Sequence, residues 1–323
     1  KIPALIKSEA AGVKHRLISY FTATFLAVTL LPSMTLHAAP YAAVVMDARN
    51  GKIYHSRNAD TRLHPASLTK MMTLYVAFQA IENNEISLDS YVTVSRNAAA
   101  EPPSKLWLKR GQKIKLRYLI RAAAIKSAND AATAIGEAIS GSEANFSKRM
   151  TRTARAMGMS RTTFKNAHGL TRAGHLSTAR DMTILGRHMI YDYPQYYNLF
   201  SRRSADAKVR KVNNTNRRFL AAYKGADGIK TGYTRAAGFN LVASAERSGK
   251  RIVATMFGGS STAARNKRVA QLLDMGFERA PSTAKLQRPS LPPYHQNESE
   301  PSGKTLRLVT AVKRSLRPKM RPF

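Results

Sequence analysis

The chain of 323 residues contains no cysteine. This excludes disulfide bonds, thiolate zinc sites and a cysteine nucleophile, but it does not fix the compartment in which the protein works. Acidic residues are also scarce: 19 Asp and Glu stand against 53 Lys and Arg, and the formal net charge is +34. So large an excess of positive charge indicates polyanionic surroundings, for which nucleic acid, anionic lipid and an acidic cell-wall polymer all qualify.

The N-terminal region lacks an apolar run of membrane-spanning length. Residues 17–31 are uncharged and mostly apolar, but this run is too short for a membrane-spanning helix of the usual length. It follows the basic residues 14–16 and precedes Ala38 and Ala39, an arrangement typical of a secretory signal cleaved after Ala38. An uncleaved anchor and a buried helix are the alternatives. We expect export to the periplasm or to the outer face of the cytoplasmic membrane, which argues against a nucleic-acid partner.

Composition divides the chain into three parts. Residues 1–38 contain the expected signal. With 43% hydrophobic residues in the chain as a whole, residues 39–281 are expected to form a globular body. After Pro281 the composition shifts to Pro, Ser, Gln and Asn and then to a basic end. We therefore expect residues 282–323 to be a tail that is disordered or binds a surface.

Strand-like segments begin and end the globular part. Residues 41–47 and 52–56 flank the turn signal Asn50-Gly51 and predict a hairpin. Two further strands are predicted over 238–245 and 251–257, followed by a closing helix over 262–277. Other helices are predicted from Ser67 to about residue 83, over 120–125, after Asn129, over 146–157 and from a cap at Ser177.

The stretch 64–72 carries the first candidate motif. It predicts a turn that opens a helix, and Ser67 and Lys70 project from one face because they are three residues apart. An uncharged amine beside a hydroxyl can accept its proton, which makes Ser67 a candidate nucleophile and Lys70 its candidate base. The pattern alone is weak, because Ser282 and Lys285 match it too.

The second candidate motif is Ser127-Ala128-Asn129. Its hydroxyl can relay a proton, and its amide can hold a substrate peptide group. The ordinary explanation is different, since a serine at the start of a helix is most often an N-cap. The same spacing also occurs at Ser56 and Ser95, so this motif alone identifies nothing.

The third motif, Lys230-Thr231-Gly232, occurs once in the chain and lies in a strand-like context. A glycine at a strand edge lets a ligand backbone approach closely. Lys230 supplies a positive charge and Thr231 a hydroxyl, which together suit a carboxylate.

His168, His175 and Asp181 are the candidate metal ligands. Their spacing fits no standard ligand motif. We therefore expect both histidines to pack within a loop, and we expect the protein to need no metal or other cofactor.

In their order and flanking residues, the three motifs resemble the low-molecular-weight penicillin-binding proteins of the D-alanyl-D-alanine carboxypeptidase family. The resemblance covers about residues 40–280 and includes the loop 166–170. It implies an α+β transpeptidase-like fold, in which an antiparallel sheet flanked by helices pairs the N-terminal hairpin with three strands after Gly228. A mainly helical lobe at about 71–190 would complete a catalytic domain of residues 39–281, with the active site between sheet and lobe.

The resemblance implies serine peptidase chemistry on peptidoglycan stem peptides. Ser67 would attack the carbonyl between two terminal D-alanines, Lys70 would accept its proton, and Ser127 would pass a proton to the leaving D-alanine. β-Lactam antibiotics would act as inhibitors that stay bound as esters. The implied substrate-binding residues are Asn129, Lys230, Thr231, Gly232, Tyr233 and Arg265.

Three alternatives to a carboxypeptidase stay open. A D,D-endopeptidase of peptide cross-links would use the same site. A β-lactamase would share the motifs but release penicillin quickly, and the chain has no convincing equivalent of the Glu motif of the class A enzymes. A non-catalytic wall-binding protein would keep the fold, although no motif residue is lost here. An anionic wall or membrane surface is a further expected partner of the excess positive charge.

Overall fold

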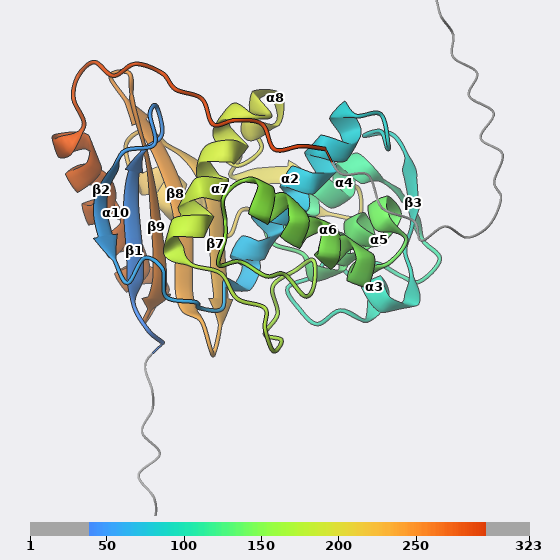
Figure 1. Ribbon diagram of the computed structural model, residues 1–323. Coiled ribbons are helices and arrows are strands. Elements are labelled where there is room, and N and C mark those ends of the chain that lie inside the picture. Colours follow the sequence, from blue (N-terminus) through green and yellow to red (C-terminus); the bar gives the residue numbers. More distant parts are fainter. Residues whose placement is uncertain (1–38, 295–323) are drawn as a thin grey trace, which may run out of the picture. The chain divides into compact units, whose positions relative to one another are not determined.

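A five-stranded antiparallel sheet forms the centre of the fold (Figure 1). The computed structural model describes residues 39–294. The strand order is β2-β1-β9-β8-β7. Their bounds are Ala42–Asp47 for β1, Ile53–Arg57 for β2, Ala226–Thr234 for β7, Gly238–Arg247 for β8 and Lys250–Gly259 for β9. The predicted pairing of the N-terminal hairpin with three later strands is confirmed, and so is the α+β class.

Strand β1 is buried on both faces, which explains its almost continuous apolar sequence. Successive residues of a strand point to opposite sides. Ala42 and Val44 accordingly belong to one apolar cluster, and Ala43 and Val45 to another. A strand with two apolar sides must lie inside a sheet that is covered on both faces. β1 does so, between β2 and β9.

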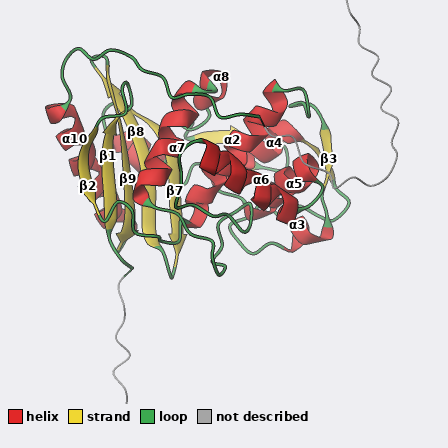
Figure 2. Cartoon of the chain, in the orientation of Figure 1, coloured by secondary structure: helices red, strands yellow, loops and turns green. Residues whose placement is uncertain are grey.

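Helices cover the two faces of the sheet (Figure 1 and Figure 2). On one face α10, Thr262–Arg279, packs against β9, β8 and β1 and buries Val269 and Leu272. On the other face α7, Ala179–Tyr191, packs against β9 and β1. The apolar cluster on the α7 side continues into the helical part of the chain, so one core joins the sheet to the lobe.

The helical lobe is built around α2, Thr69–Glu82, in which residues 69–80 are all buried. One 3-10 turn, Ala66–Leu68, precedes α2 and is labelled η1. The predicted mainly helical lobe is therefore confirmed. The remaining elements are β3 (Tyr91–Thr93), α3 (Arg96–Ala100), β4 (Lys113–Lys115), α4 (Leu116–Arg121), the π-helical turn η2 (Ala122–Lys126), α5 (Asn129–Ser140), α6 (Glu143–Ala156), α8 (Pro194–Tyr197), β5 (Ser204–Asp206), β6 (Lys211–Asn213) and α9 (Arg217–Ala222).

Two helix starts differ from the sequence-based expectation. The N-cap of α7 is Thr178 and not Ser177, because the Thr178 side chain accepts the hydrogen bond from the Asp181 N–H. At α5 the N-cap position is Ala128, while Ser127 has a left-handed backbone. The ordinary explanation of the second motif, a serine cap, therefore does not apply.

The segment after α10 packs against the rest of the chain (orange to red in Figure 1). We call residues 281–294 the strap. Arg49, in the turn between β1 and β2, donates hydrogen bonds to Pro281 O at 2.9 Å and to Ser282 O at 3.3 Å. Further along, the Gln287 N–H donates to Arg49 O at 2.8 Å. One residue of the hairpin turn thus holds the strap at two places.

The strap ends beside an ion pair whose arginine is fully buried. Tyr294 Oη donates to Glu85 at 2.5 Å, and the Arg149 guanidinium lies 5.4 Å from the centre of the Tyr294 ring. Arg149 and Glu85 form a bidentate pair with two N–O distances of 2.9 Å. The expectation of a disordered or surface-binding tail therefore differs from the structure over residues 282–294, because composition alone does not register contacts with distant parts of the chain.

Two expectations concern residues outside the described part of the chain. These are the secretory signal in residues 1–38 and the distal tail in residues 295–323. Within residues 39–294, no helix combines the length and the apolar character that a membrane crossing requires.

We expect the strap to stabilise the body. A chain ending at Ala280 loses the hydrogen bonds between Arg49 and the strap and the hydrogen bond from Tyr294 to Glu85, whereas a chain ending at Tyr294 keeps them. Because each hydrogen bond contributes about 0.5–1.5 kcal/mol, the shorter chain should have a Tm several degrees lower, measured by calorimetry. The activity expected from the three motifs should persist in both chains at low temperature, since the strap does not line the cleft that contains Ser67. Equal Tm values would show that the strap adds no stability.

Candidate active site

Ser67 lies in the short turn η1, immediately before α2. Ala66, the residue before it, has a left-handed backbone with φ of 49°, which is unfavourable for a residue with a side chain. Such conformations persist where surrounding contacts fix the chain. Gly169 supplies one of these contacts: a Cβ at Gly169 would lie 1.8 Å from Ala66 O, so only glycine fits against the turn.

Lys70 is fully buried one helical turn further on, and its Nζ lies 3.2 Å from Ser67 Oγ. The same Nζ donates to Asn129 Oδ1 and to His168 O, both at 2.7 Å. An uncharged amine has two N–H groups and one lone pair. With both N–H groups directed at Asn129 and His168, the lone pair faces the Ser67 hydroxyl, as a general base requires.

The surroundings of Lys70 favour its uncharged form. Burial lowers the pKa of Lys70 well below its usual value, and the positive charge of Lys230 lowers it further. Glu101 and Asp130 act in the opposite direction without outweighing the burial. The structure thus brings the predicted nucleophile next to an amine whose environment suits a base.

Ser127 and Lys230 form a second hydrogen-bonded pair. Ser127 follows η2 in a left-handed conformation with φ of 65°. Its Oγ accepts a hydrogen bond from Lys230 Nζ at 2.9 Å, and Lys230 donates another to Thr231 O at 2.9 Å. Burial, followed by the charge of Arg265, lowers the pKa of Lys230 to about 7. A hydroxyl bonded to such an amine is suited to relay a proton.

Asn129 is fixed by three hydrogen bonds. Its Oδ1 accepts from Lys70, its Nδ2 donates to Pro102 O at 2.8 Å, and its backbone N–H donates to Ser104 O at 2.7 Å. The last two bonds attach the second motif to the loop between α3 and β4. The base and this loop are therefore positioned by the same side chain.

Two supporting residues have a structural role that the sequence analysis does not assign. Asp130 is fully buried, and its carboxylate accepts from the backbone N–H groups of Leu106 and Leu108 at 2.9–3.0 Å. Asn240, fully buried on β8, donates to His64 O at 3.2 Å and so ties the loop before the nucleophile to the sheet. The available signal for Asn240 was its position between Phe239 and Leu241 in a predicted strand, whereas Asp130, beside Asn129 at a helix start, gave no such signal.

Strand β7 carries the third motif and lies against the nucleophile turn. A Cβ at Gly232 would lie 3.0 Å from Pro65 O and 3.2 Å from Ser67 N. This close approach of two backbones explains the glycine in the motif. The next residue, Tyr233, has 56% of its surface exposed and lies at the rim.

The nine predicted site residues gather around one cleft of about 360 Å³. Lys70 and Lys230 are buried and reach the cleft through their bonds to Ser67 and Ser127. Burial lowers the pKa of Arg265 to about 10, so it remains a cation at neutral pH. The seven predicted residues that line the cleft are Ser67, Ser127, Asn129, Thr231, Gly232, Tyr233 and Arg265.

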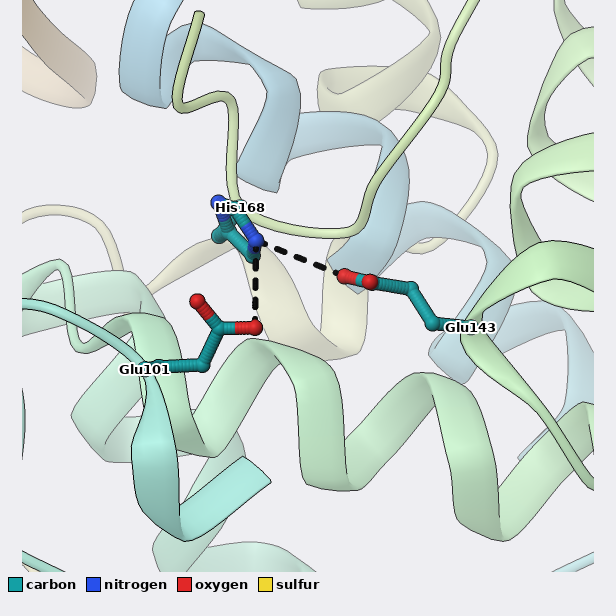
Figure 3. Close-up of side chains that lie close together, drawn as sticks. All are labelled: Glu101, Glu143 and His168. Carbon is teal, nitrogen blue, oxygen red and sulfur yellow. Dashed lines mark ion pairs between the residues drawn. The ribbon is translucent and has the colours of Figure 1, made fainter. Parts of the chain in front are cut away.

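Three ionisable side chains meet beside the loop that bonds Lys70 (Figure 3). His168 Nε2 lies 3.3 Å from Glu101 Oε1 and 3.4 Å from Glu143 Oε1. The three atoms lie within 4.8 Å of one another, which is close enough for one metal ion. Among residues 39–294 this is the group with metal-ligand spacing, and it includes neither His175 nor Asp181.

The hydrogen bonds of His168 indicate a ring proton on Nε2. Its Nδ1 accepts from the Leu170 N–H at 3.1 Å, so a neutral ring donates from Nε2 to the two carboxylates. A metal at Nε2 would require the proton on Nδ1, facing the Leu170 N–H. Burial raises the pKa of Glu101, but the hydrogen bond from His168 and further partners lower it overall. The cluster thus holds His168, and with it the carbonyl that accepts from Lys70.

His175 packs inside the loop, as predicted. Its Nδ1 accepts from the Lys165 N–H at 3.1 Å, and its Nε2 lies 2.8 Å from Thr69 Oγ1. Burial lowers the pKa of His175 to about 3, so the ring is neutral in the working range of most proteins. Asp181 instead accepts from Thr162 Oγ1 at 2.6 Å.

Residues 31–261 match the family model of the S11 peptidases, the D-alanyl-D-alanine carboxypeptidases. The chain belongs to this family. It is 37% identical over 241 residues to D-alanyl-D-alanine carboxypeptidase DacF of Bacillus subtilis, a match that covers 73% of this chain and 61% of DacF. It is also 34% identical over 283 residues to D-alanyl-D-alanine carboxypeptidase DacC of Escherichia coli, a match that covers 85% of this chain and 69% of DacC. The chain thus spans about three fifths of the length of DacF.

Solved structures of penicillin-binding proteins have the same fold. Penicillin binding protein 5 of Haemophilus influenzae is 35% identical with a TM-score of 0.71, covering 75% of this chain and 72% of that one. Penicillin-Binding Protein D2 of Listeria monocytogenes, in its ampicillin-bound form, is 33% identical with a TM-score of 0.68. The match covers 76% of this chain and 100% of that one. The suspected family and the transpeptidase-like fold are confirmed.

The two lysines generate a pH prediction for this S11 peptidase. A base acts without its proton and an anion anchor acts with it, so acylation by an anionic substrate should rise with pH as Lys70 deprotonates. It should fall above about pH 7 as Lys230 loses its charge. Second-order acylation rates with labelled penicillin, measured across this range, test both limbs.

The corresponding variants separate the two roles. Lys70→Ala should lower the acylation rate by about 10²–10⁴-fold at every pH, the range typical of a general base. Lys230→Ala should mainly raise the penicillin concentration needed for half-maximal rate and remove the falling limb. Acylation by Lys70→Ala at the wild-type rate would assign the base to another group.

Proposed function

We propose that the protein is a serine-type D-alanyl-D-alanine carboxypeptidase that removes the terminal D-alanine from peptidoglycan stem pentapeptides through an acyl-enzyme. This proposal rests on the contact of Ser67 with Lys70. The hydrogen bonds from Lys70 to Asn129 and His168 leave the lone pair of its amine for the serine. The cleft around this pair also contains Thr231 and Arg265, which suit a terminal carboxylate. Membership of the S11 family supports the same reaction.

Acylation follows from these contacts. Ser67 Oγ attacks the carbonyl between the two D-alanines while its proton moves to Lys70 Nζ. The tetrahedral intermediate then breaks its C–N bond, and the leaving D-alanine nitrogen takes a proton through the Ser127 hydroxyl, which Lys230 orients. Asn129 lines the cleft and holds the peptide group of the substrate.

The backbone supplies the charge stabilisation in this proposal. The N–H groups of Ser67 and Tyr233 bind the oxyanion. A Cβ at Gly232 would lie 3.2 Å from Ser67 N, so the strand that carries Tyr233 passes close to the nucleophile turn, which supports this role. Each such donor contributes about 2.7–4 kcal/mol in acyl transfer. Lys230, Thr231 and Arg265 bind the terminal carboxylate.

Water completes the reaction by hydrolysing the ester. A β-lactam would form the same ester at Ser67, and Penicillin-Binding Protein D2 of Listeria monocytogenes has been solved in ampicillin- and cefotaxime-bound forms. No Asp or Glu is among the described residues that line the cleft, so a carboxylate that would activate water for fast release is lacking there. We therefore favour inhibition by β-lactams over a β-lactamase activity. A non-catalytic wall-binding role is disfavoured because the complete base–nucleophile contact is present.

We further propose that the protein acts outside the cytoplasm, in the periplasm or at the outer face of the cytoplasmic membrane. The layout of residues 1–38 supports this, and so does a substrate that belongs to the cell wall. In that location the net charge of +34 favours contact with the anionic wall or membrane surface and not with nucleic acid.

Labelled penicillin should form a stable adduct at Ser67. The wild-type protein and Ser67→Ala are incubated with the label, digested and analysed by mass spectrometry. The wild type should yield one modified peptide containing Ser67, and the variant should yield none. As a matched control, Ser282→Ala removes the serine of the second Ser-x-x-Lys sequence and should label fully. A label on another serine would contradict the assignment of the nucleophile.

Arg265→Ala should impair the capture of the terminal carboxylate. A charged hydrogen bond contributes about 1.5–3 kcal/mol, so KM for an acyl-D-Ala-D-Ala peptide should rise by roughly 10- to 150-fold with a smaller change in kcat. D-alanine release from the free acid measures the effect. A peptide amidated at its C-terminus is the control, since its slow cleavage should not respond to the substitution. An equal response of both peptides would place Arg265 in another role.

A further inference from the structure

A hollow of about 470 Å³ lies between α6 and the segment 163–172, which includes the loop that bonds Lys70. Two hydrogen bonds of Thr151 hold its walls together. The Thr151 hydroxyl accepts from the Phe164 N–H at 3.0 Å and donates to Ser147 O, within α6, at 2.9 Å. The two walls therefore have a fixed relative position, and we call the space between them the cationic hollow.

All the charged side chains that line the cationic hollow are positive. No Asp or Glu is among the described residues that line it. Within residues 39–294 none of its cations forms an ion pair, whereas Arg149 of the same helix is paired with Glu85. A local excess of unpaired positive charge attracts an anionic ligand. The five cationic lining residues are Lys148, Arg152 and Arg155 of α6, and Lys165 and Arg172 of the segment 163–172.

The three cations of α6 lie on one face of the helix. Arg152 is four residues after Lys148 and three before Arg155, and residues at these spacings are neighbours on a helix surface. Like charges so placed destabilise a helix. An anion bound in the cationic hollow would relieve this repulsion, which no acidic side chain of the hollow does.

The cationic hollow begins where one end of the active-site cleft stops. Leu170 lines the cleft, and Arg172 lines the hollow. Two residues of extended chain span at most about 7 Å, so the two spaces are close neighbours. Between them the Thr171 hydroxyl donates to Thr234 Oγ1 of β7 at 3.3 Å. A ligand that leaves the cleft beside Thr234 therefore meets Arg172.

Strand β7 shows which part of a substrate points to this end. Thr231 is a proposed partner of the terminal carboxylate, and a Cβ at Gly232 would lie 3.2 Å from Ser67 N, so the reacting carbonyl belongs beside Gly232. Thr234 is two residues further, about 7 Å along the strand. The acyl part of the substrate, which stays on Ser67, thus runs away from the carboxylate end toward Thr234 and the cationic hollow.

The length of a stem pentapeptide suits this path. Three residues precede the two terminal D-alanines, and in extended conformation they cover about 10 Å. This exceeds the span of about 7 Å between Leu170 and Arg172. A carboxylate on these residues can therefore reach the hollow while the scissile bond lies at Ser67.

We propose that the cationic hollow binds a carboxylate in the acyl part of the stem peptide, so that the enzyme prefers stem peptides in which the carboxylates upstream of the D-alanines are free. Arg172 and Lys165 form the edge nearest the cleft, and an arginine side chain can bind a carboxylate through two parallel hydrogen bonds. The cations of α6 add to the attraction. This inference rests on the proposed acyl-enzyme reaction at Ser67 and specifies its substrate.

Two observations favour a substrate carboxylate over the phosphates of a lipid surface. The hollow lies beside the cleft, so a group attached to the substrate reaches it in the same binding event. Arg152 is half-buried, whereas a flat surface contacts exposed side chains.

A pair of peptides tests the inference. One is an acidic stem pentapeptide, and the other is the same peptide with its upstream carboxylates converted to amides and its terminal carboxylate free. D-alanine release gives kcat/KM for each. For the wild type we expect kcat/KM to be at least tenfold higher for the acidic peptide.

Variants of the cationic hollow should lose this preference. Lys148→Glu/Arg155→Glu should lower the ratio of the two kcat/KM values at least fivefold. Arg172→Gln, which keeps a donor for Lys165 O, should lower it about threefold or more. The matched control, Lys224→Glu/Lys267→Glu, makes the same change of net charge as the double variant at exposed positions outside the hollow and should keep the wild-type ratio. Penicillin labelling of Ser67 reports whether each variant has folded.

The outcomes separate this inference from the proposed function. Absence of both penicillin labelling and D-alanine release in the wild type would overturn the two together. Labelling with equal kcat/KM for the two peptides would overturn the inference alone. So would an equal loss of preference in the hollow variant and the matched control, which would assign the effect to net charge. Loss of binding to anionic lipid vesicles in the hollow variant, with the peptide preference unchanged, would assign the hollow to a membrane surface instead.

Discussion

The rest of this structure depends on one constraint, which is the burial of two lysine amines in the same site. Lys70 is 0% exposed and Lys230 is 1% exposed, and the charge of each is disfavoured by burial. An amine in this situation must find acceptors inside the protein. Asn129 and His168 supply them for Lys70 from positions 59 and 98 residues away along the chain. The chemistry of the serine is therefore available only in the folded lobe.

Much of the fold and of the site could be predicted because residue type carries the signal. The doubly apolar β1, the Asn50-Gly51 turn and the motif residues each have a side chain or backbone preference that fits their place. The acceptor role of His168 could not be predicted from its side chain, since the acceptor is its backbone carbonyl. Glu101 and Glu143 were missed for a related reason. They lie far apart in the sequence and become neighbours only through the loop that contains His168.

The strap was predicted wrongly for a different reason: its local sequence indicates a linker but carries no sign of the distant residues that hold it. Its prolines and small polar residues are typical of a linker, and no periodic apolar pattern indicates packing. It is held instead by backbone carbonyls that accept from Arg49 and by a tyrosine at the Arg149–Glu85 pair. Such anchors are single residues at distant positions, and no window of sequence contains both partners.

The nucleophile turn packs directly against two glycines, Gly169 and Gly232, and there is no space for a side chain at either position. This has a consequence for the evolution of drug resistance. A mutation that narrows the floor of the cleft to exclude an antibiotic would displace the Ser67 turn and abolish the enzyme's own reaction. At Gly169 and Gly232, therefore, selection by antibiotics cannot narrow the cleft by adding a side chain, whereas the exposed Tyr233 at the rim is not enclosed in this way.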